Sequence, residues 1–307
     1  MRAITLSEYG GPDDLEPAEF PEPKVAPGEV LVRVRAAGVN PVDWKIAEGL
    51  LDALLEVRFP LVPGWDVAGV VEQVGLDVEE FSVGDEVMGY IRKDTVQLGA
   101  YAERVAASVR LLARRPAALS WEQAAGLPLA GLTAYQSLER VGVAAGETVL
   151  VHAAAGGVGS LGVQLAVARG ARVIGTASER NHGFLRELGA EPVAYGDGLA
   201  ERVRELAPEG VDAALDFVGG GVVDLSQELL RRRDRVASIA DPEAVAKGGH
   251  YVWVRPDSVD LTVLADLADA GRLDVPVDRV LPLADAAEAW RYSRTGRARG
   301  KVVLTVD

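Results

Sequence analysis

Residues 148–178 constrain the fold of this chain more than any other stretch of the sequence. An apolar run leads into the glycine-rich turn 153–159, and a segment with helical apolar spacing follows. A dinucleotide-binding turn needs small residues at three places: for the tight turn, for close approach of the backbone to a pyrophosphate, and for packing of helix on strand. Ala154, Gly156 and Gly159 hold those places, with alanine substituting at the first. The stretch predicts a strand, a phosphate-binding turn and a helix.

The start of that helix and the end of the next strand bear on the cofactor. The amides of Gly157 and Val158 are expected to receive the phosphates with the help of the helix dipole. The glycine pattern alone also fits an ordinary close-packed turn. The next strand ends without the acid that NAD-binding folds place there for the ribose 2′-hydroxyl. Ser178 and Arg180 instead offer a hydroxyl and a guanidinium to a 2′-phosphate, whereas Glu179 opposes one and Arg180 also fits a solvated helix start. We therefore expect NADP(H).

The rest of the chain divides by its patterns into two parts. Short apolar runs alternate with helical patterns, which predicts parallel strands joined by helical crossovers. The expected strands are 148–152, 172–176, 191–194, 213–217 and 235–239, and the expected helices are 158–169, 179–188, 197–206 and 222–233. The earlier part is rich in β-branched runs with Gly and Pro between them, and the run 301–306 returns to it. The prediction is an α/β protein in which a doubly wound parallel-sheet domain, 120–253, interrupts a β-rich domain, 1–119 together with 254–307.

Composition narrows the classes of partner and compartment. The 46 acidic residues exceed the 32 basic ones among 307, so the formal net charge is −14, and a nucleic-acid partner is not expected. The absence of cysteine excludes disulfides, thiolate catalysis and cysteine-ligated zinc, and fits a reducing compartment. The apolar stretch 149–168 is broken by glycines, so a strand and helix explain it better than a membrane span. With no apolar signal-peptide core in the first ten residues, we expect a cytoplasmic protein.

A series of ordered motifs resembles one known family over nearly the whole chain. The motifs are AAGVNPVDWK (36–45), PGWDVAGVV (63–71), VGDEV (83–87), GAYAE (99–103), LPLAGLTA (127–134), the AAGGVG turn and GKVV (300–303). The chain resembles the zinc-free quinone oxidoreductase branch of the medium-chain dehydrogenase/reductase superfamily. That resemblance implies a GroES-like β-rich catalytic domain, a Rossmann domain that binds NADP(H), and a homodimer.

The resemblance also bears on zinc. In the zinc-dependent relatives a cysteine occupies the place of Asn40, and a Gly-His-Glu run occupies 64–66, where this chain has Gly-Trp-Asp. Catalytic zinc takes about three protein ligands from Cys, His and carboxylate. Of the three histidines, none neighbours Asn40 in sequence, and His152 in its apolar strand is predicted to be a core residue with a satisfied ring. We expect no metal.

The resemblance assigns catalytic roles near the first of these motifs. It places Asn40 beside the nicotinamide ribose and the substrate. Asp43 and Lys45 stand two residues apart, which in an extended segment puts both on one side. Lys45 lies where some relatives carry tyrosine, so it is a candidate proton donor or oxyanion partner. It equally fits a surface lysine paired with Asp43.

The resemblance also places residues against the cofactor. Thr133 is expected near the nicotinamide and Tyr195 near the 2′-phosphate, although Tyr195 also fits a buried strand-end tyrosine. Trp253 is expected near the nicotinamide or in ordinary core. The cofactor contacts expected from the family are completed by Val218, Ile239 and Lys301.

Without a Lewis acid, the reaction must depend on cofactor positioning, hydrogen bonds to a developing enolate and a proton source. The expected reaction is NADPH-dependent reduction of a quinone, enone or enal. The apolar run 50–57 is consistent with a lid over an apolar substrate. Two alternatives remain: reduction of an enoyl or enone intermediate of polyketide-like biosynthesis, and a non-catalytic NADPH-binding protein with the same fold.

Overall fold

The structure, a computed structural model, describes residues 1–306. The chain forms two compact units. The first unit contains Met1–Leu129, Pro256–Gly271 and the chain from Val275 onward, and the second contains Ala130–Arg255 with Arg272–Asp274.

The second unit is built on a six-stranded parallel sheet in the order β12-β11-β10-β13-β14-β15. Its strands are β10 (Thr148–Val151), β11 (Arg172–Ala177), β12 (Ala190–Ala194), β13 (Ala213–Asp216), β14 (Val236–Ser238) and β15 (His250–Tyr251). All five strands expected from the sequence are present, and the short β15 was not expected. The order reverses between β10 and β13, and in such sheets a ligand binds beyond the carboxyl ends of the strands at that point.

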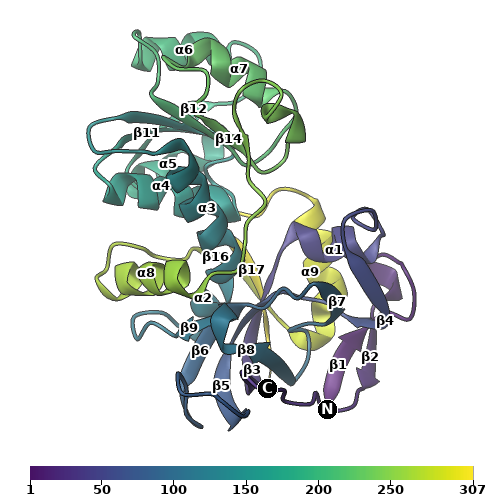
Figure 1. Cartoon of the computed structure of the whole chain (residues 1–307). Coiled ribbons are helices and arrows are strands. Elements are labelled where there is room, and N and C mark those ends of the chain that lie inside the picture. The colour runs from purple at the N-terminus through teal and green to yellow at the C-terminus, as the bar shows by residue number, and fades with distance from the viewer. Residues whose placement is uncertain (307) are drawn as a thin grey trace. The chain divides into compact units, whose positions relative to one another are not determined.

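Helices cover both faces of this sheet. They are α3 (Pro128–Val141), α4 (Gly157–Ala168), α5 (His182–Glu187), α6 (Leu199–Leu206) and α7 (Val222–Leu229). Figure 1 shows α6 and α7 on one face and α3 and α4 on the other. The apolar stretch 149–168 is β10, the glycine turn and α4, as predicted. Among residues 1–306, no helix is both long and apolar enough to span a bilayer.

The first unit is β-rich. Its main sheet has seven strands: β16-β17-β3-β5-β6-β9 in order, with β8 paired to β3. The strands are β1 (Arg2–Thr5), β2 (Glu16–Glu19), β3 (Glu29–Val39), β4 (Glu56–Val62), β5 (Asp66–Val74), β6 (Glu86–Tyr90), β7 (Thr95–Leu98), β8 (Arg104–Ser108), β9 (Leu112–Arg114), β16 (Val277–Pro282) and β17 (Lys301–Thr305). The pairs β1-β2 and β4-β7 form two smaller sheets. The final strand β17 pairs with β3, so the C-terminal segment returns to the N-terminal part as predicted.

Four helices belong to the first unit: α1 (Pro41–Ala47), α2 (Trp121–Gly126), α8 (Ser258–Asp269) and α9 (Ala286–Arg294). A capping box starts α2, because the Ser120 hydroxyl accepts from the amide of Gln123 at 3.3 Å and the Gln123 side chain accepts from the amide of Ser120 at 3.1 Å. This helix packs against β3, β5 and β17. The segment 120–129, placed with the second domain in the sequence analysis, therefore lies in the first unit.

Candidate active site

The glycine turn after β10 is held by a side chain from the next strand. Ala153 has a left-handed backbone, φ +52°, which an alanine adopts only when its surroundings impose it. Thr176 of β11 supplies that constraint, since its hydroxyl accepts from the amide of Ala153 at 3.1 Å and its carbonyl accepts from the amide of Ala154 at 3.0 Å. Thr176 was not among the predicted site residues. Its signal in the sequence is a hydroxyl inside an apolar strand.

Two glycines of the turn face different surroundings. A Cβ on Gly159 would meet the Ala153 carbonyl oxygen at 2.2 Å and the Ala154 Cα at 2.7 Å, so the protein itself requires glycine there. A Cβ on Gly156, which has an ordinary φ of −79°, would meet only the Ala153 oxygen at 3.4 Å. Fold packing therefore leaves room for a side chain at position 156. The bare backbone there, just before Gly157 and Val158 begin α4, suits a group that approaches the helix start closely.

The other predicted cofactor residues of the second unit follow successive strands of its sheet. At the carboxyl ends lie Ser178 after β11, Tyr195 after β12, Val218 after β13, Ile239 after β14 and Trp253 after β15. Three of them are unusually exposed for apolar or aromatic side chains: Tyr195 at 64%, Val218 at 57% and Trp253 at 41%. The alternative of a buried Tyr195 is therefore wrong. The edge fits an NADP(H) site, in which the α4 start would hold the pyrophosphate and Ser178, Arg180 and Tyr195 the 2′-phosphate side.

A buried acid shapes two of these loops. Asp216, at the end of β13, accepts hydrogen bonds from the amides of Val218 and Gly219 at 2.8 and 2.7 Å. Its other oxygen accepts from the hydroxyl of Ser238, the last residue of β14, at 2.6 Å. The Ser238 oxygen in turn accepts from the amide of Asp241 at 2.8 Å. The loops that carry Val218 and Ile239 are thus fixed by one Asp–Ser pair, which the sequence analysis did not identify.

The first unit contains a buried polar cluster formed by Asn40, Asp66 and Lys301, which we call the Asp66 cluster. The side-chain amide of Asn40 donates to Asp66 Oδ2 at 2.8 Å, and Lys301 Nζ donates to Asn40 Oδ1. Asp66 Oδ1 accepts from the amide of Leu129 at 2.8 Å, and Lys301 Nζ lies 3.9 Å from Asp66 Oδ2. All three side chains are at most 4% exposed. The predicted residues Asn40 and Lys301 are thus brought together by Asp66, which the predictions did not include.

Asp43 lies beside this cluster in α1. Its Oδ2 accepts from the backbone amide of Asn40 at 2.8 Å and from the hydroxyl of Tyr101 at 3.0 Å. The indole of Trp290 donates to that same hydroxyl at 3.2 Å. Asp43 Oδ1 is buried and has no hydrogen-bond partner among the described residues. A buried polar atom without a partner is rare and calls for a functional explanation.

Lys45 is placed differently from the expectation. The segment that carries it is the helix α1, so the expectation of an extended segment there is wrong. Pro41 opens this helix because its missing N–H and fixed φ suit the first turn. Residues two apart on a helix point to different sides. Asp43 is accordingly buried, whereas Lys45 is exposed and its ammonium lies 5.6 Å from the ring centre of Trp44.

Burial governs the electrostatics of both acids. It raises the pKa of Asp66 to about 6, and Lys301 and the hydrogen bonds from Asn40 and Leu129 limit the rise. Burial raises the pKa of Asp43 to about 7. The hydrogen bonds from Asn40 and Tyr101 and the charge of Lys301 oppose that rise, and the charge of Asp66 adds to it. Burial also lowers the pKa of Lys301. The two buried carboxyl groups of Asp43 and Asp66 therefore share one ammonium group, that of Lys301, which lies beside Asp66.

His152, directly after β10, is a core residue as predicted. It is 1% exposed, and its Nε2 lies 2.8 Å from the hydroxyl of Ser226. Burial lowers the pKa of its imidazole to about 4, so the ring is neutral near pH 7. Thr133 is likewise buried, within α3 of the second unit.

The donors around Asn40 do not form a zinc site. Within residues 1–306, no group of three or more His, Cys, Asp or Glu side chains is arranged to hold a metal ion. Where zinc-dependent relatives have ligands, this chain has the amide of Asn40 and the indole of Trp65. The Lys301 ammonium already donates to Asn40 Oδ1, and a fixed cation there opposes a second one.

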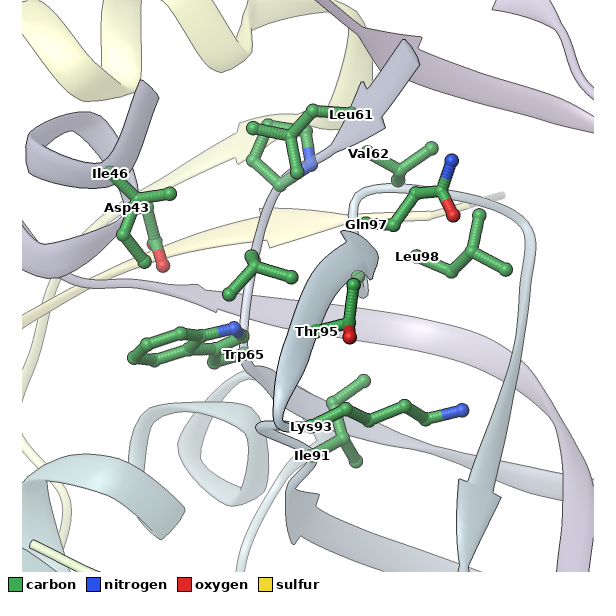
Figure 2. Close-up of a pocket in the computed structure, with 14 residues that line it drawn as sticks. Asp43, Ile46, Leu61, Val62, Trp65, Ile91, Lys93, Thr95, Gln97 and Leu98 are labelled. Atoms are coloured by element: carbon green, nitrogen blue, oxygen red, sulfur yellow. The ribbon is translucent and has the colours of Figure 1, made fainter. Parts of the chain in front are cut away.

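A pocket opens beside Asp43 within the first unit. Figure 2 shows Asp43 and Ile46, from α1, at one end of it and Gln97 and Leu98, from β7, at the other. Its lining is mostly apolar and comes from α1, β4, β7 and the segments around Trp65 and Ile91. Asp43, whose Oδ1 has no hydrogen-bond partner among the described residues, is thus one of the residues that line this pocket.

A two-unit chain with this parallel sheet and this β-rich unit has the architecture of medium-chain dehydrogenases/reductases. The sequence matches the family described as "Alcohol dehydrogenase GroES-like domain" over residues 26–117 and that described as "Zinc-binding dehydrogenase" over residues 188–304. It is 35% identical to the NADPH-dependent alkenal/one oxidoreductase, chloroplastic, of Arabidopsis thaliana, over 99% of this chain and 79% of that relative. The protein belongs to the quinone oxidoreductase-like family of medium-chain dehydrogenases/reductases.

Two further relatives are informative. The solved structure of the quinone oxidoreductase from Coxiella burnetii superposes with a TM-score of 0.87 at 34% identity, over 100% of this chain and 99% of that one. The chain is also 35% identical to erythronolide synthase EryA2 of Saccharopolyspora erythraea, covering 94% of this chain but 8% of that protein. The predicted fold class and family are confirmed.

Proposed function

We propose that this oxidoreductase reduces the activated C=C bond of an enone or enal, or a quinone, with NADPH and without zinc. The observation that carries the proposal is the carboxyl edge of the second unit's sheet, which has the turn at Gly156 after β10 and exposed side chains after β12, β13 and β15. Relatives named as an alkenal/one oxidoreductase and a quinone oxidoreductase support the substrate class. NADPH supplies the hydride when bound.

The chain's own residues then bind the cofactor, hold the substrate oxygen and provide a proton. The α4 start with Gly157 and Val158 binds phosphate through amides, and Asp216 holds the following loops in place. In the first unit Asn40 and Asp43 are the proposed catalytic groups. Lys45, exposed on α1, is the alternative proton donor, and substitutions of Lys45 and of Asp43 distinguish the two.

The first test uses the purified protein. We expect NADPH to be oxidised on addition of cyclohex-2-enone or 1,4-naphthoquinone, followed at 340 nm, because neither acceptor needs a Lewis acid to take up hydride. Activity should be unchanged after dialysis against EDTA, with less than one tenth of an equivalent of zinc by mass spectrometry. If the protein binds NADPH but does not oxidise it with any of the acceptors, the non-catalytic alternative is supported. Activity that is lost after EDTA treatment would refute zinc independence.

Replacement of Arg180 tests the choice of cofactor. Arg180 and Ser178 follow β11 at the position where a 2′-phosphate would lie. We expect Arg180→Gln to raise the Kd of NADPH about tenfold, a loss of about 1.4 kcal/mol, and to leave that of NADH unchanged. Arg186→Gln, a replacement on the adjacent helix α5, is the matched control. Equal loss of both cofactors would contradict a 2′-phosphate contact.

A second candidate substrate is an enoyl thioester. The likeness to erythronolide synthase EryA2, which its name describes as a biosynthetic enzyme, favours it. It would be distinguished by kcat/KM for an N-acetylcysteamine enoyl thioester against that for the free enone of equal chain length. A kcat/KM for the thioester more than about ten times that for the free enone would favour a biosynthetic function.

The expectations of a homodimer and a cytosolic location stay predictions. Light scattering coupled to gel filtration would show about twice the chain mass of 32.4 kDa for a dimer. Subcellular fractionation would test the location.

A further inference from the structure

We propose that Asp43, in its neutral form, donates the proton to the carbonyl oxygen of the substrate, and that the pocket that Asp43 lines binds that carbonyl group and the apolar carbons next to it. This inference rests on the proposed function and assigns the proton donor and the substrate pocket within the first unit.

The hydrogen bonds of Asp43 determine which oxygen carries the proton. Oδ2 accepts from two donors, the amide of Asn40 and the hydroxyl of Tyr101. The Tyr101 oxygen itself accepts from the indole of Trp290, so its own proton is directed to Asp43. A neutral carboxyl has one O–H, and with Oδ2 occupied by two donors that O–H is on Oδ1. Oδ1 is buried and has no hydrogen-bond partner among residues 1–306, and Asp43 is one of the residues that line the pocket. A buried donor of this kind needs an acceptor, and a carbonyl oxygen is one.

The placement of charge explains why Asp43 is the neutral acid of the pair. Lys301 lies beside Asp66 and donates to Asn40, and its ammonium has no ion pair with Asp43 within 4 Å in the described chain. One cation compensates one carboxylate, so ionising both acids would leave an uncompensated charge in the interior. The Lys301 ammonium lies closer to Asp66 and stabilises its carboxylate more, so Asp43 is the acid that keeps its proton.

The remaining charged groups near the pocket are compensated elsewhere. Lys93, which lines the pocket, pairs with Glu29 at 3.0 Å. On α9, which packs against α1, Arg294 pairs with Glu48. Burial raises the pKa of the Tyr90 hydroxyl, so this neighbour is neutral over the working range. None of these groups supplies the counter-charge that an ionised Asp43 would need.

The pocket has the chemistry of a site for a carbonyl on an apolar group. Near Asp43 it is walled by Ile46, Leu61 and Trp65, and further along by Val96 and Leu98. Such walls exclude water and strengthen a hydrogen bond to the oxygen that gains charge. Lys93, Thr95 and Gln97 also line the pocket, and Asp43 is the one acid in its lining among the described residues.

Reduction of the enone requires a hydride on carbon and a proton on oxygen. NADPH, when bound, would supply a hydride to the β-carbon of the enone. The π electrons would then shift toward the carbonyl, and negative charge would grow on the oxygen. The Asp43 Oδ1–H bond breaks and an O–H bond forms on that oxygen, which gives the enol. Asp43 is left as a carboxylate that Asn40 and Tyr101 stabilise, and it regains a proton from solvent. The enol becomes the saturated ketone in water. For a quinone the same proton completes the hydroquinone.

The first test is Asp43→Asn, which is isosteric and keeps an acceptor for Asn40 and Tyr101 but has no proton to transfer. We expect kcat with cyclohex-2-enone to fall about 100-fold with the Kd of NADPH unchanged. For wild type, kcat should be constant at low pH and fall as pH rises through about 7, since the acid form is needed. That fall should be absent in the variant. Asp278→Asn is a matched control, because Asp278 also accepts from a tyrosine, Tyr292, at 2.5 Å.

A second variant separates proton donation from a structural role. The Tyr101 hydroxyl stabilises the Asp43 carboxylate, so Tyr101→Phe should raise the pKa of Asp43 and move the fall in kcat to higher pH. A variant that is merely less stable would lower kcat without moving the pH at which it falls. Tyr292→Phe is the control at the matched pair.

A third measurement needs no turnover. Burial disfavours the charged Asp43, so the folded state holds its proton up to about pH 7 while the unfolded state loses it near pH 4. Wild-type stability should therefore fall between pH 4 and 7 relative to Asp43→Asn. The melting temperature of the cofactor-free variant should exceed that of wild type by more at pH 8 than at pH 4.5.

Two outcomes would overturn the inference. One is an Asp43→Asn variant with wild-type kcat and an unchanged pH profile. The other is loss of the pH dependence in Lys45→Gln instead, which would assign the proton to Lys45. Failure of the wild-type protein to oxidise NADPH with any acceptor would instead refute the proposed function, and the melting curves would still report whether Asp43 is neutral.

Discussion

Gly156→Ala is expected to fold normally and to bind NADPH about 100-fold more weakly, whereas Gly159→Ala is expected to lose the structure of the turn. At position 156 the added methyl has space and the backbone has an ordinary conformation. The methyl would occupy the region at the start of α4 where a pyrophosphate must approach the amides. A 100-fold change in Kd corresponds to about 2.7 kcal/mol.

Gly159 is different because the obstruction is the protein's own backbone. Its Cβ would lie 2.2 Å from the Ala153 oxygen, in a turn that Thr176 fixes through two hydrogen bonds. We expect a loss of about 3 kcal/mol in the free energy of unfolding. Thermal melts and fluorescence titration with NADPH would measure both variants. Equal melting losses in the two would contradict the claim that Gly156 is kept small for a ligand.

The sequence predicted the second unit well because its signals are local. Apolar runs of four to six residues alternate with helical spacing, and each strand, turn and helix can be recognised from neighbouring residues. The capping box at Ser120 is likewise a short pattern, and it is present at the start of α2. What the pattern did not indicate was the packing partner of α2, which is the sheet of the first unit.

The first unit's site was only partly predictable, since its contacts join distant parts of the chain. Asn40 meets Asp66 across 26 positions and Lys301 across 261. The charged residue Asp66 near the start of the apolar run 65–71 indicates a buried acid. The neighbouring sequence does not indicate which residues pair with it. The error at Lys45 has a simple cause: Pro41 after Asn40 is also a helix-start signal, and an extended segment was expected instead.

The Asp66 cluster leads to the second large effect. Lys301→Met keeps the length of the side chain in β17 but removes the ammonium, and leaves Asp66 buried without a counter-charge. Removing one partner of a buried pair is much more damaging than replacing both. We expect the free energy of unfolding at pH 8 to fall by about 3–5 kcal/mol, measured by urea denaturation of the cofactor-free protein.

The pH dependence of that loss identifies its cause. Burial already raises the pKa of Asp66 to about 6, and without the opposing charge of Lys301 it rises further. At pH 5 Asp66 is then protonated in the variant, so the loss relative to wild type should be smaller than at pH 8. The double variant Asp66→Asn with Lys301→Met should recover most of the stability at pH 8, because no buried charge of the pair remains. Equal losses at both pH values, without recovery in the double variant, would mean that Lys301 stabilises β17 through its aliphatic chain.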